Sequence, residues 1–207
     1  MLIIGITGGI ASGKTEVAKV FQKMGALVLS GDEMGKEVVE KNPELFCKLV
    51  HVFGKEILTK EKKLNRQKLG KIAFATSQST RKLNDLVHPY LLQNLKSKIK
   101  NLKRKNYKNP VIIDAALIVE WGMQNELDFL IFVDCPRKKR IERLIRKKGY
   151  TRKEALDRIK AQLAERYKKR EADFVIKNDR GLSELKQKAK SLWHKILQIK
   201  KKVDKKV

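Results

Sequence analysis

The 207-residue sequence predicts an α/β fold in which a doubly wound, five-stranded parallel sheet carries one helical insertion. Three observations lead to this fold class. Five short apolar runs have the length of buried strands, apolar residues recur at helical spacing between them, and a glycine-rich loop joins the first run to the first helix. Strands that alternate with helices in this way are typical of a doubly wound sheet.

The predicted strands are short apolar runs. The first contains Leu2, Ile3, Ile4 and Ile6 and ends in glycines, as expected for a buried strand that feeds a turn. The other four are Leu27–Leu29, Val111–Ile113, Leu130–Val133 and Phe174–Ile176. We expect these five segments to form the sheet.

The predicted helices follow from spacing and capping signals. A first helix with Gly25 at its C-terminal end is indicated by Val17, Val20, Phe21 and Met24. Thr151 and Glu154 have the spacing of a capping box, so we expect one helix from there to about Arg170. A last helix is indicated by the apolar stripe Leu182, Leu185, Ala189, Leu192, Trp193 and Ile196.

The interval from Glu33 to Asn109 has no convincing strand. Its leucine spacing is helical, with Leu83, Leu86, Val87, Leu91, Leu92 and Leu95 as the clearest stripe. We therefore expect a helical insertion between the second and third strands.

The formal net charge of +26 lies mostly in residues 96–108, 134–170 and 181–207, the last ending in a lysine-rich tail after Ile199. Such a charge attracts polyanions non-specifically. The lysines fall between helical apolar positions, and no alternation of aromatic and basic residues marks a nucleic-acid module. We favour solvated helix faces and expect no specific nucleic-acid partner.

The cysteines and the hydropathy indicate the cellular compartment in which the protein is expected. Cys47 and Cys135 are far apart and form no Cys-x-x-Cys pair, so neither a disulfide framework nor a zinc cluster is indicated. No apolar run approaches the roughly 20 residues that span a bilayer, and the start of the chain has no basic leader. We expect a cytoplasmic protein with no membrane association.

A phosphate-binding loop is the most specific signal. Residues 8–15 match Gly-x4-Gly-Lys-Ser/Thr and lie between the first strand and the first helix, where the motif requires them. Backbone N–H groups of such a loop bind phosphate oxygens at the helix N-terminus. Lys14 is then expected to reach the β- and γ-phosphates of ATP, and Thr15 to bind Mg²⁺. The expected nucleotide-binding residues of the loop are Gly8, Gly9, Ile10, Ala11, Ser12, Gly13, Lys14, Thr15 and Glu16.

Asp32 closely follows the second strand. The carboxyl ends of neighbouring parallel strands line the ligand crevice, so its carboxylate is placed to orient or deprotonate an attacking hydroxyl. The alternative is that Asp32 only caps a helix that begins near Glu33.

Further motifs follow in a fixed order. They are Gly5–Thr15, Ser30–Asp32, Arg81–Pro89, Asp114–Glu120, Arg143–Arg146, Arg158–Gln162 and Ala172–Asn178. In this order and spacing the chain, to about residue 200, resembles the dephospho-CoA kinases. The resemblance implies phosphorylation of the ribose 3′-hydroxyl of dephospho-CoA by ATP and Mg²⁺, in the last step of coenzyme A synthesis. It also implies a P-loop NTPase-type sheet with a helical substrate-binding insertion and a mobile helical lid.

The resemblance also implies a division of the single domain. The nucleotide-binding core is expected at about 1–32 and 110–200, the insertion at about 33–109 and the lid at about 137–170.

Residue roles are implied in the same way. Asp32 resembles the family's catalytic carboxylate. Arg143, with Arg146 nearby, resembles the lid arginine that neutralises the charge of the transferring phosphoryl group. Asn178 resembles the loop that meets the adenine. The substrate-binding residues implied are Arg81, His88, Pro89, Leu117 and Glu120.

Simpler readings remain open for several residues. His88 and Pro89 could mark the start of a helix, Glu120 could pair with a neighbouring lysine, and Arg143 could lie on a solvated face. Asp114 resembles the acid that helps to hold Mg²⁺ in other phosphate-loop enzymes, but could be a structural cap. Trp121 and Trp193 are interpreted as packing residues.

The chain departs from the family pattern at Ser30, Ala116, Glu16 and Arg140. The family usually has Asp in place of Ser30, Pro in place of Ala116 and a hydroxyl residue in place of Glu16, and it often has Gln in place of Arg140. Lys14, Thr15 and Asp32 are retained, so the chemistry is expected to survive.

Two other functions compete with this one. A different small-molecule or nucleotide kinase would share the fold, although no other acceptor family accounts for His88-Pro89 and Arg158–Gln162 together. A nucleic-acid-binding ATPase is suggested only by the net charge.

Overall fold

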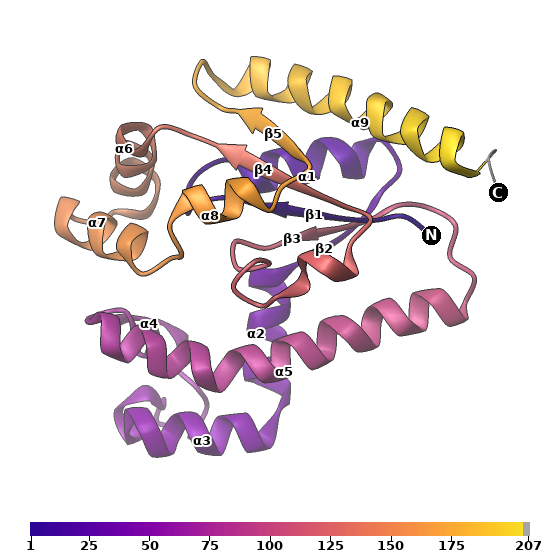
Figure 1. Ribbon diagram of the computed structural model, residues 1–207. Helices are drawn as coiled ribbons and strands as arrows, with labels where there is room; N and C mark the ends of the chain where they lie inside the picture. Colours follow the sequence, from indigo (N-terminus) through magenta and orange to yellow (C-terminus); the bar gives the residue numbers. More distant parts are fainter. Residues whose placement is uncertain (205–207) are drawn as a thin grey trace.

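The computed structural model describes residues 1–204. Within them, five strands form one parallel sheet in the order β2-β3-β1-β4-β5 (Figure 1). The strands are β1 (Ile3–Thr7), β2 (Leu27–Ser30), β3 (Val111–Asp114), β4 (Phe129–Asp134) and β5 (Phe174–Lys177). The expected fold class and all five strands are confirmed.

The central strand β1 is buried on both sides because helices cover both faces of the sheet. Ile3 and Ile4 point to opposite faces, as successive strand residues must, and each belongs to a separate core cluster. The cluster around Ile4 includes α1 (Lys14–Lys23) and α9 (Leu182–Asp204), and that around Ile3 includes α2 (Gly31–Lys41), α3 (Pro43–Phe53) and α5 (Ser77–Arg104). Figure 1 shows the two helical layers above and below the sheet.

The signals at α1 and α9 are confirmed. Gly25 follows α1 with φ 97°, a left-handed conformation that glycine adopts without strain. Trp193 is buried against Phe21, with ring centroids 4.9 Å apart, so its packing role is confirmed. Helix α9 continues through Lys200–Lys202, while Lys205 and Lys206 of the tail lie outside the described residues.

The segment between β2 and β3 contributes no strand to the sheet. It folds as α2, α3, the 3₁₀ turn Lys55–Ile57, α4 (Arg66–Ala73) and α5, with one isolated bridge between Leu58 and Leu64. Pro89 lies well inside α5, whose N-terminus is capped by Thr76. The alternative that His88 and Pro89 mark the start of a helix is therefore wrong.

The segment after β4 forms three short helices, α6 (Arg137–Lys148), α7 (Arg152–Lys160) and α8 (Glu165–Arg170). The capping box at Thr151 and Glu154 is confirmed, but the single helix expected to run on to Arg170 is wrong. The helix stops at residues 161–164, where the Gln162 side-chain oxygen accepts from the Ile10 N–H and the Leu163 N–H donates to Glu120.

The carboxyl ends of the strands face α6 and α7 (Figure 1). Among the helices of residues 1–204, none combines the length and hydropathy that a bilayer-spanning segment needs.

Candidate active site

The phosphate loop connects β1 to α1 and depends on glycine at several points. Gly8 has φ 146° and Gly13 has φ 105°, and both are closely packed. A side chain at Gly8 would collide with the Val133 carbonyl, and one at Gly13 with the Asn178 side chain. Ala11, at φ 61°, also takes the left-handed conformation. These positive φ values let the loop turn tightly just before α1, and the N-terminus of a helix is where N–H groups bind an anion.

Lys14 folds back over this loop. Its Nζ donates to the Gly9 carbonyl at 3.1 Å. Burial lowers the pKa of Lys14, while the negative charges of Asp114 and Asp32 act to raise it. The two carboxylates therefore favour the charged form of this lysine, against the effect of burial.

Thr15 and Asp114 form a hydrogen-bonded pair beside Lys14. The Thr15 hydroxyl donates to Asp114 Oδ2 at 2.8 Å. Burial raises the pKa of Asp114, and the bond from Thr15 and the charge of Lys14 oppose the rise. Asp114 thus faces the phosphate loop, so the structural-cap alternative does not describe its side chain.

Asp32 lies just beyond the end of β2, the strand that pairs with β3. It is in the first turn of α2 and is exposed. The helix cap is Ser30, whose Oγ accepts from the Glu33 N–H at 3.3 Å. The alternative that Asp32 caps this helix is therefore wrong. Ser30, a departure from the family pattern, has a structural use.

Glu16, another departure, lies in the first turn of α1. Its carboxylate pairs with Lys19 at 3.2 Å on the surface. The added negative charge is thus partly balanced by a lysine of the same helix.

His88 and Glu120 lie near each other where α5 meets the turn after β3. His88 packs edge-on against Trp121, with ring centroids 5.6 Å apart. Burial lowers the pKa of His88, and Asp85 and Glu120 act to raise it. Leu117, from the same turn after β3, is half-buried, whereas Arg81 and Pro89 are exposed on α5. The structure therefore brings together His88 and Glu120, but leaves Arg81 at the surface.

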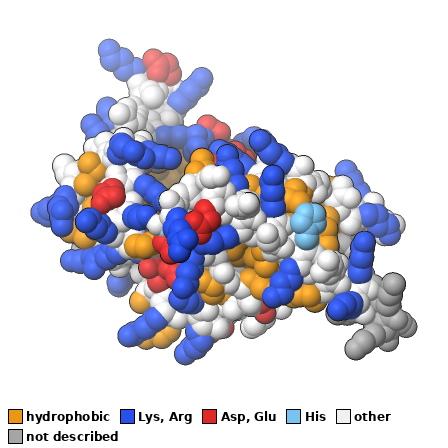
Figure 2. Space-filling model, turned by 90° about the horizontal axis from the view of Figure 1, so that it is seen from above, with side chains coloured by type: hydrophobic (Ala, Val, Ile, Leu, Met, Phe, Trp, Pro, Cys, Tyr) orange, Lys and Arg blue, Asp and Glu red, His pale blue; other side chains and the backbone are white. Residues whose placement is uncertain are grey.

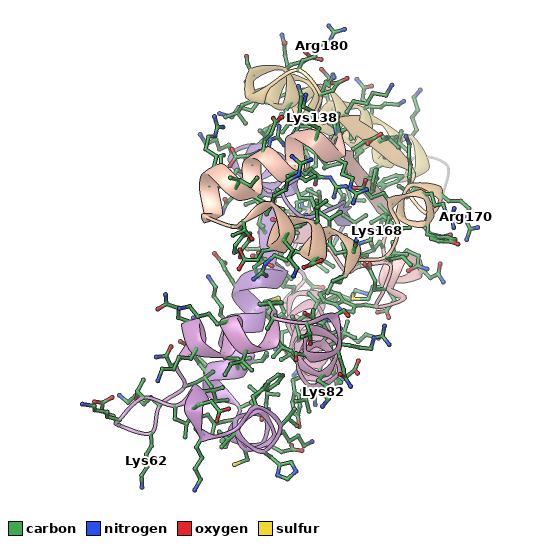
Figure 3. All side chains as sticks on the ribbon, turned by 90° about the vertical axis from the view of Figure 1, so that its left-hand side faces the viewer. Lys62, Lys82, Lys138, Lys168, Arg170 and Arg180 are labelled. Carbon is green, nitrogen blue, oxygen red and sulfur yellow. The ribbon has the colours of Figure 1, made fainter. Side chains whose placement is uncertain are left out.

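Lys168 is a functional candidate that the sequence reasoning missed. It is fully buried, and its Nζ lies 2.5 Å from Glu120 Oε1 and donates to the Ala116 carbonyl at 2.6 Å. Figure 3 shows it inside the fold, while Lys62, Arg170 and Arg180 point outward. Glu120 does pair with a lysine, but with this buried one and not a sequence neighbour. No sequence signal separates Lys168 from the other cations.

Arg143 contacts the far end of the phosphate loop. Its guanidinium donates to the carbonyls of Ala11 and Ser12, at 3.1 and 3.4 Å, and to Asn178 Oδ1 at 3.3 Å. Asn178 is buried and also donates to the Ser12 carbonyl at 2.6 Å. The solvated-face alternative is therefore wrong, and the role of Arg143 toward the phosphoryl group stays a prediction.

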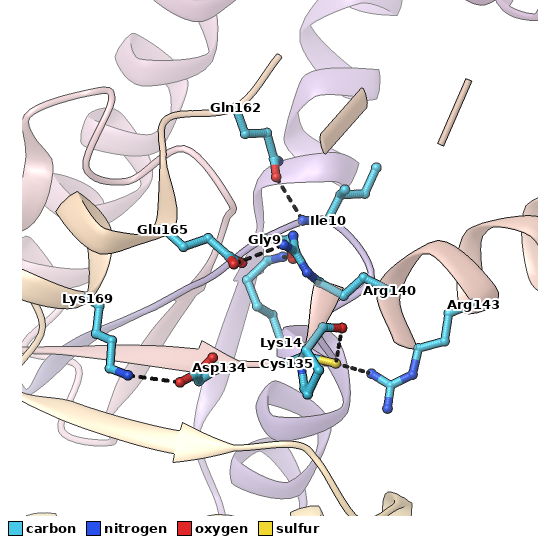
Figure 4. A network of polar contacts seen from close by, with 11 residues as sticks. Gly9, Ile10, Lys14, Asp134, Cys135, Arg140, Arg143, Gln162, Glu165 and Lys169 are labelled. Carbon is cyan, nitrogen blue, oxygen red and sulfur yellow. Dashed lines mark hydrogen bonds and ion pairs between the residues drawn. The ribbon is translucent and has the colours of Figure 1, made fainter. Parts of the chain in front are cut away.

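Three more side chains from the segment after β4 lie over Gly9 and Ile10 (Figure 4). Gln162 Oε1 accepts from the Ile10 N–H at 2.8 Å. Arg140 is buried, pairs with Glu165 at 2.9 Å and lies directly against Gly9, as does the Glu165 carboxylate. The sequence signals for this group were the departure from the family pattern at Arg140 and the Arg158–Gln162 motif, and neither showed that these side chains meet at Gly9 and Ile10.

A divalent metal would find oxygen ligands here. Among the described residues, no three acidic, His or Cys side chains form a ready-made metal cage. Mg²⁺ commonly uses one or two protein oxygens together with phosphate and water. The Thr15 hydroxyl and the Asp114 carboxylate, in contact beside the phosphate loop, fit this donor set.

Known proteins resemble the chain over nearly all its length. The family model for dephospho-CoA kinase matches residues 2–184. A dephospho-CoA kinase from Carboxydothermus hydrogenoformans is 33% identical over 93% of both chains, and one from Bacillus licheniformis is 36% identical over 88% of this chain and 90% of its own. The solved structure of TT1252 from Thermus thermophilus is 28% identical, with TM-score 0.73, over 94% of this chain and 97% of its own.

The phosphate loop is complete. The region of the chain that matches the family also includes the helical insertion and the segment after β4. The chain therefore belongs to the dephospho-CoA kinase family and is an ATP-dependent kinase.

Proposed function

We propose that this kinase phosphorylates the ribose 3′-hydroxyl of dephospho-CoA at the carboxyl ends of β1, β2 and β3. Phosphorylation of dephospho-CoA completes coenzyme A synthesis, the reaction of the family to which the chain belongs. The observation that carries the proposal is the meeting of Lys14, Thr15, Asp32 and Asp114 at three neighbouring strand ends. A phosphate-binding cation thus faces two carboxylates, one buried and one exposed.

ATP is proposed to bind with its phosphates along residues 8–15. The N–H groups of the loop and of the α1 N-terminus bind phosphate oxygens. Lys14 lies at the Gly9 end and stabilises the charge that develops on the transferring group. Asn178, fixed to the Ser12 carbonyl, lies at the other end, where we place the nucleoside.

Asp32 is proposed to accept the proton of the attacking hydroxyl, or to orient that hydroxyl. It is exposed toward solvent, close to Lys14, and its side chain is not used as the helix cap. A carboxylate with these properties is free to hydrogen-bond an incoming hydroxyl. Asp114, in contrast, is buried against Thr15 and has no such freedom.

Mg²⁺, when bound, would neutralise phosphate charge and orient the transferred group. Thr15 and Asp114 would hold it. Because these two residues come from α1 and β3, the metal would connect the phosphate loop to the central sheet.

The helices α2–α5 are proposed to bind the acceptor, with His88 and the Leu117–Glu120 turn at the boundary to the core. The helices α6–α8 are proposed to act as a lid that excludes water during transfer. The domain limits remain those expected from the sequence. We also propose a cytoplasmic location, because this synthesis supplies a cofactor of cytoplasmic enzymes.

A coupled assay of ADP formation tests the proposal. Turnover is measured with ATP, Mg²⁺ and dephospho-CoA, and compared with AMP, with CMP and with no acceptor. We expect turnover with dephospho-CoA to exceed the other three by about 10² or more, because the acceptor site must exclude shorter nucleotides. Equal turnover with AMP or CMP would instead support another nucleotide kinase.

A further inference from the structure

Two arginines one turn apart on α6 contact opposite ends of the phosphate loop. We propose that Arg140 is the catalytic arginine that contacts the transferring phosphoryl group, and that Arg143 is a positioning residue that holds the loop at its nucleoside end. The inference rests on the proposed binding of ATP along this loop.

Arg140 is buried, and not all of its N–H groups are used in hydrogen bonds. Its side chain is 3% exposed, and one terminal nitrogen donates to Glu165 Oε2 at 2.9 Å. Among the described residues, its Nε has no hydrogen-bond partner, and neither does Glu165 Oε1. Buried polar atoms are nearly always paired, so the unpaired Nε leaves Arg140 with an N–H donor available to an anionic ligand. The other terminal nitrogen lies directly against Gly9.

The Gly9 end of the loop is the end where phosphoryl transfer takes place. The lysine of such a loop reaches the β- and γ-phosphates, and Lys14 Nζ is bound to the Gly9 carbonyl. Arg140 Nη1 lies against the same glycine, so the two cations share this end of the loop. Two cations there would both stabilise the charge on the transferring group.

Oxygen atoms of the lid already occupy this end. The amide oxygen of Gln162 accepts from the Ile10 N–H at 2.8 Å, and the Glu165 carboxylate lies against Gly9 (Figure 4). These are acceptor oxygens of the kind that a phosphate presents to N–H groups and to arginine. We infer that phosphate oxygens take their places, and that Arg140 then exchanges Glu165 for phosphate.

Arg143 has no comparable capacity. Its Nη1 donates to the Ala11 and Ser12 carbonyls and lies 3.3 Å from Cys135 Sγ, and its Nη2 donates to Asn178. Turning this guanidinium toward a phosphate would break contacts that fix the loop to the segment after β5. Its work is therefore to hold Ala11, Ser12 and Asn178 in place.

The test compares three methionine variants, Arg140→Met, Arg143→Met and the exposed Lys138→Met on the same helix. For each, kcat and KM for ATP are measured with dephospho-CoA, and the Kd for ADP by calorimetry. We expect Arg140→Met to lower kcat by about 10² or more while the Kd for ADP changes less than about threefold. Arg143→Met should raise KM for ATP and Kd for ADP together, with the smaller loss of kcat, and Lys138→Met should match the wild type.

A double variant separates chemistry from support of the fold. Arg140→Met with Glu165→Met removes both charges of the pair, which proteins often tolerate. We expect it to recover the Tm lost by Arg140→Met but not the kcat. Recovery of both, or a kcat of Arg140→Met within about threefold of wild type, would overturn the inference. A wild-type protein without turnover on dephospho-CoA would instead overturn the proposed function and this inference with it.

Discussion

At the scale of single residues, Lys14 owes its properties to opposing influences. Burial lowers its pKa, whereas Asp114 and Asp32 favour the charged form. A phosphate at the same place would add negative charge and strengthen the ammonium form further. The charge on Lys14 is therefore best supported when the loop is filled.

We expect Lys14→Ala to retain less than about 1% of wild-type turnover, because the loss of one transition-state stabiliser costs 10² or more. The fold should persist, since the Nζ makes a single hydrogen bond to a loop carbonyl. Steady-state kinetics and thermal unfolding measure the two effects, with the exposed Lys19→Ala as control. Retention of more than about a tenth of the activity would contradict the phosphate-loop role.

Asp32→Asn is expected to lower kcat by about 10² to 10⁴ with little change in KM for ATP, because the carboxylate acts on the acceptor hydroxyl. The Tm should hardly move, since Ser30 caps α2. The neighbouring exposed Glu33→Gln is the control. A variant that loses stability but keeps its turnover per folded molecule would show that Asp32 is structural.

At the scale of elements, the helix break between α7 and α8 could not be predicted from local sequence. Residues 161–164 contain neither glycine nor proline, and the capping box at Thr151 signals only where the helix begins. The break coincides with contacts to distant segments, from Gln162 to Ile10 and from Leu163 to Glu120. Tertiary contacts have overridden a helical pattern here.

Lys168 fixes α8 to the turn after β3, and this pair yields a stability prediction. Glu120→Ala leaves a buried ammonium without its carboxylate, which should lower the free energy of unfolding by about 3–5 kcal/mol. The double change Glu120→Ala with Lys168→Met should restore most of it. Urea unfolding provides the measurement.

The matched control for this pair is Glu126→Ala. Glu126 pairs with Lys96, but both side chains are about half exposed, so the expected loss is below about 1 kcal/mol. If Glu120→Ala and Glu126→Ala lower the free energy of unfolding equally, the pair of Glu120 with Lys168 stabilises the fold no more than an exposed pair does.

At the scale of the whole molecule, the fold was predictable because its signals are local and regular. Each strand is a short apolar run, and the loop motif fixed the strand-to-helix order around residues 8–15. The site was only partly predictable. With 49 Lys and Arg residues, the sequence could not show that Arg140 and Lys168 are buried while most others are exposed. Burial depends on which elements meet, and helical spacing alone does not carry that information.

The net charge leads to a prediction for the molecule as a whole. Figure 2 shows basic side chains spread over the face seen from above, not gathered in one patch. We expect weak polynucleotide binding whose affinity falls by about 10³ or more between 50 and 200 mM salt if six or more phosphates are contacted. Fluorescence anisotropy with two unrelated single strands should give affinities within about threefold of each other. A tenfold preference for one strand would indicate specific recognition.

The sheet order has a consequence for how the chain folds. β2 pairs with β3, yet all of α2–α5 lies between them in the sequence, and β1 pairs with both β3 and β4. On a ribosome, β1 and β2 emerge early and have no strand neighbour in this sheet until the insertion has been made. Closing so long a loop costs entropy before any pairing repays it, and a high contact order slows folding. The insertion that lies beside the active site therefore also sets when the sheet can form.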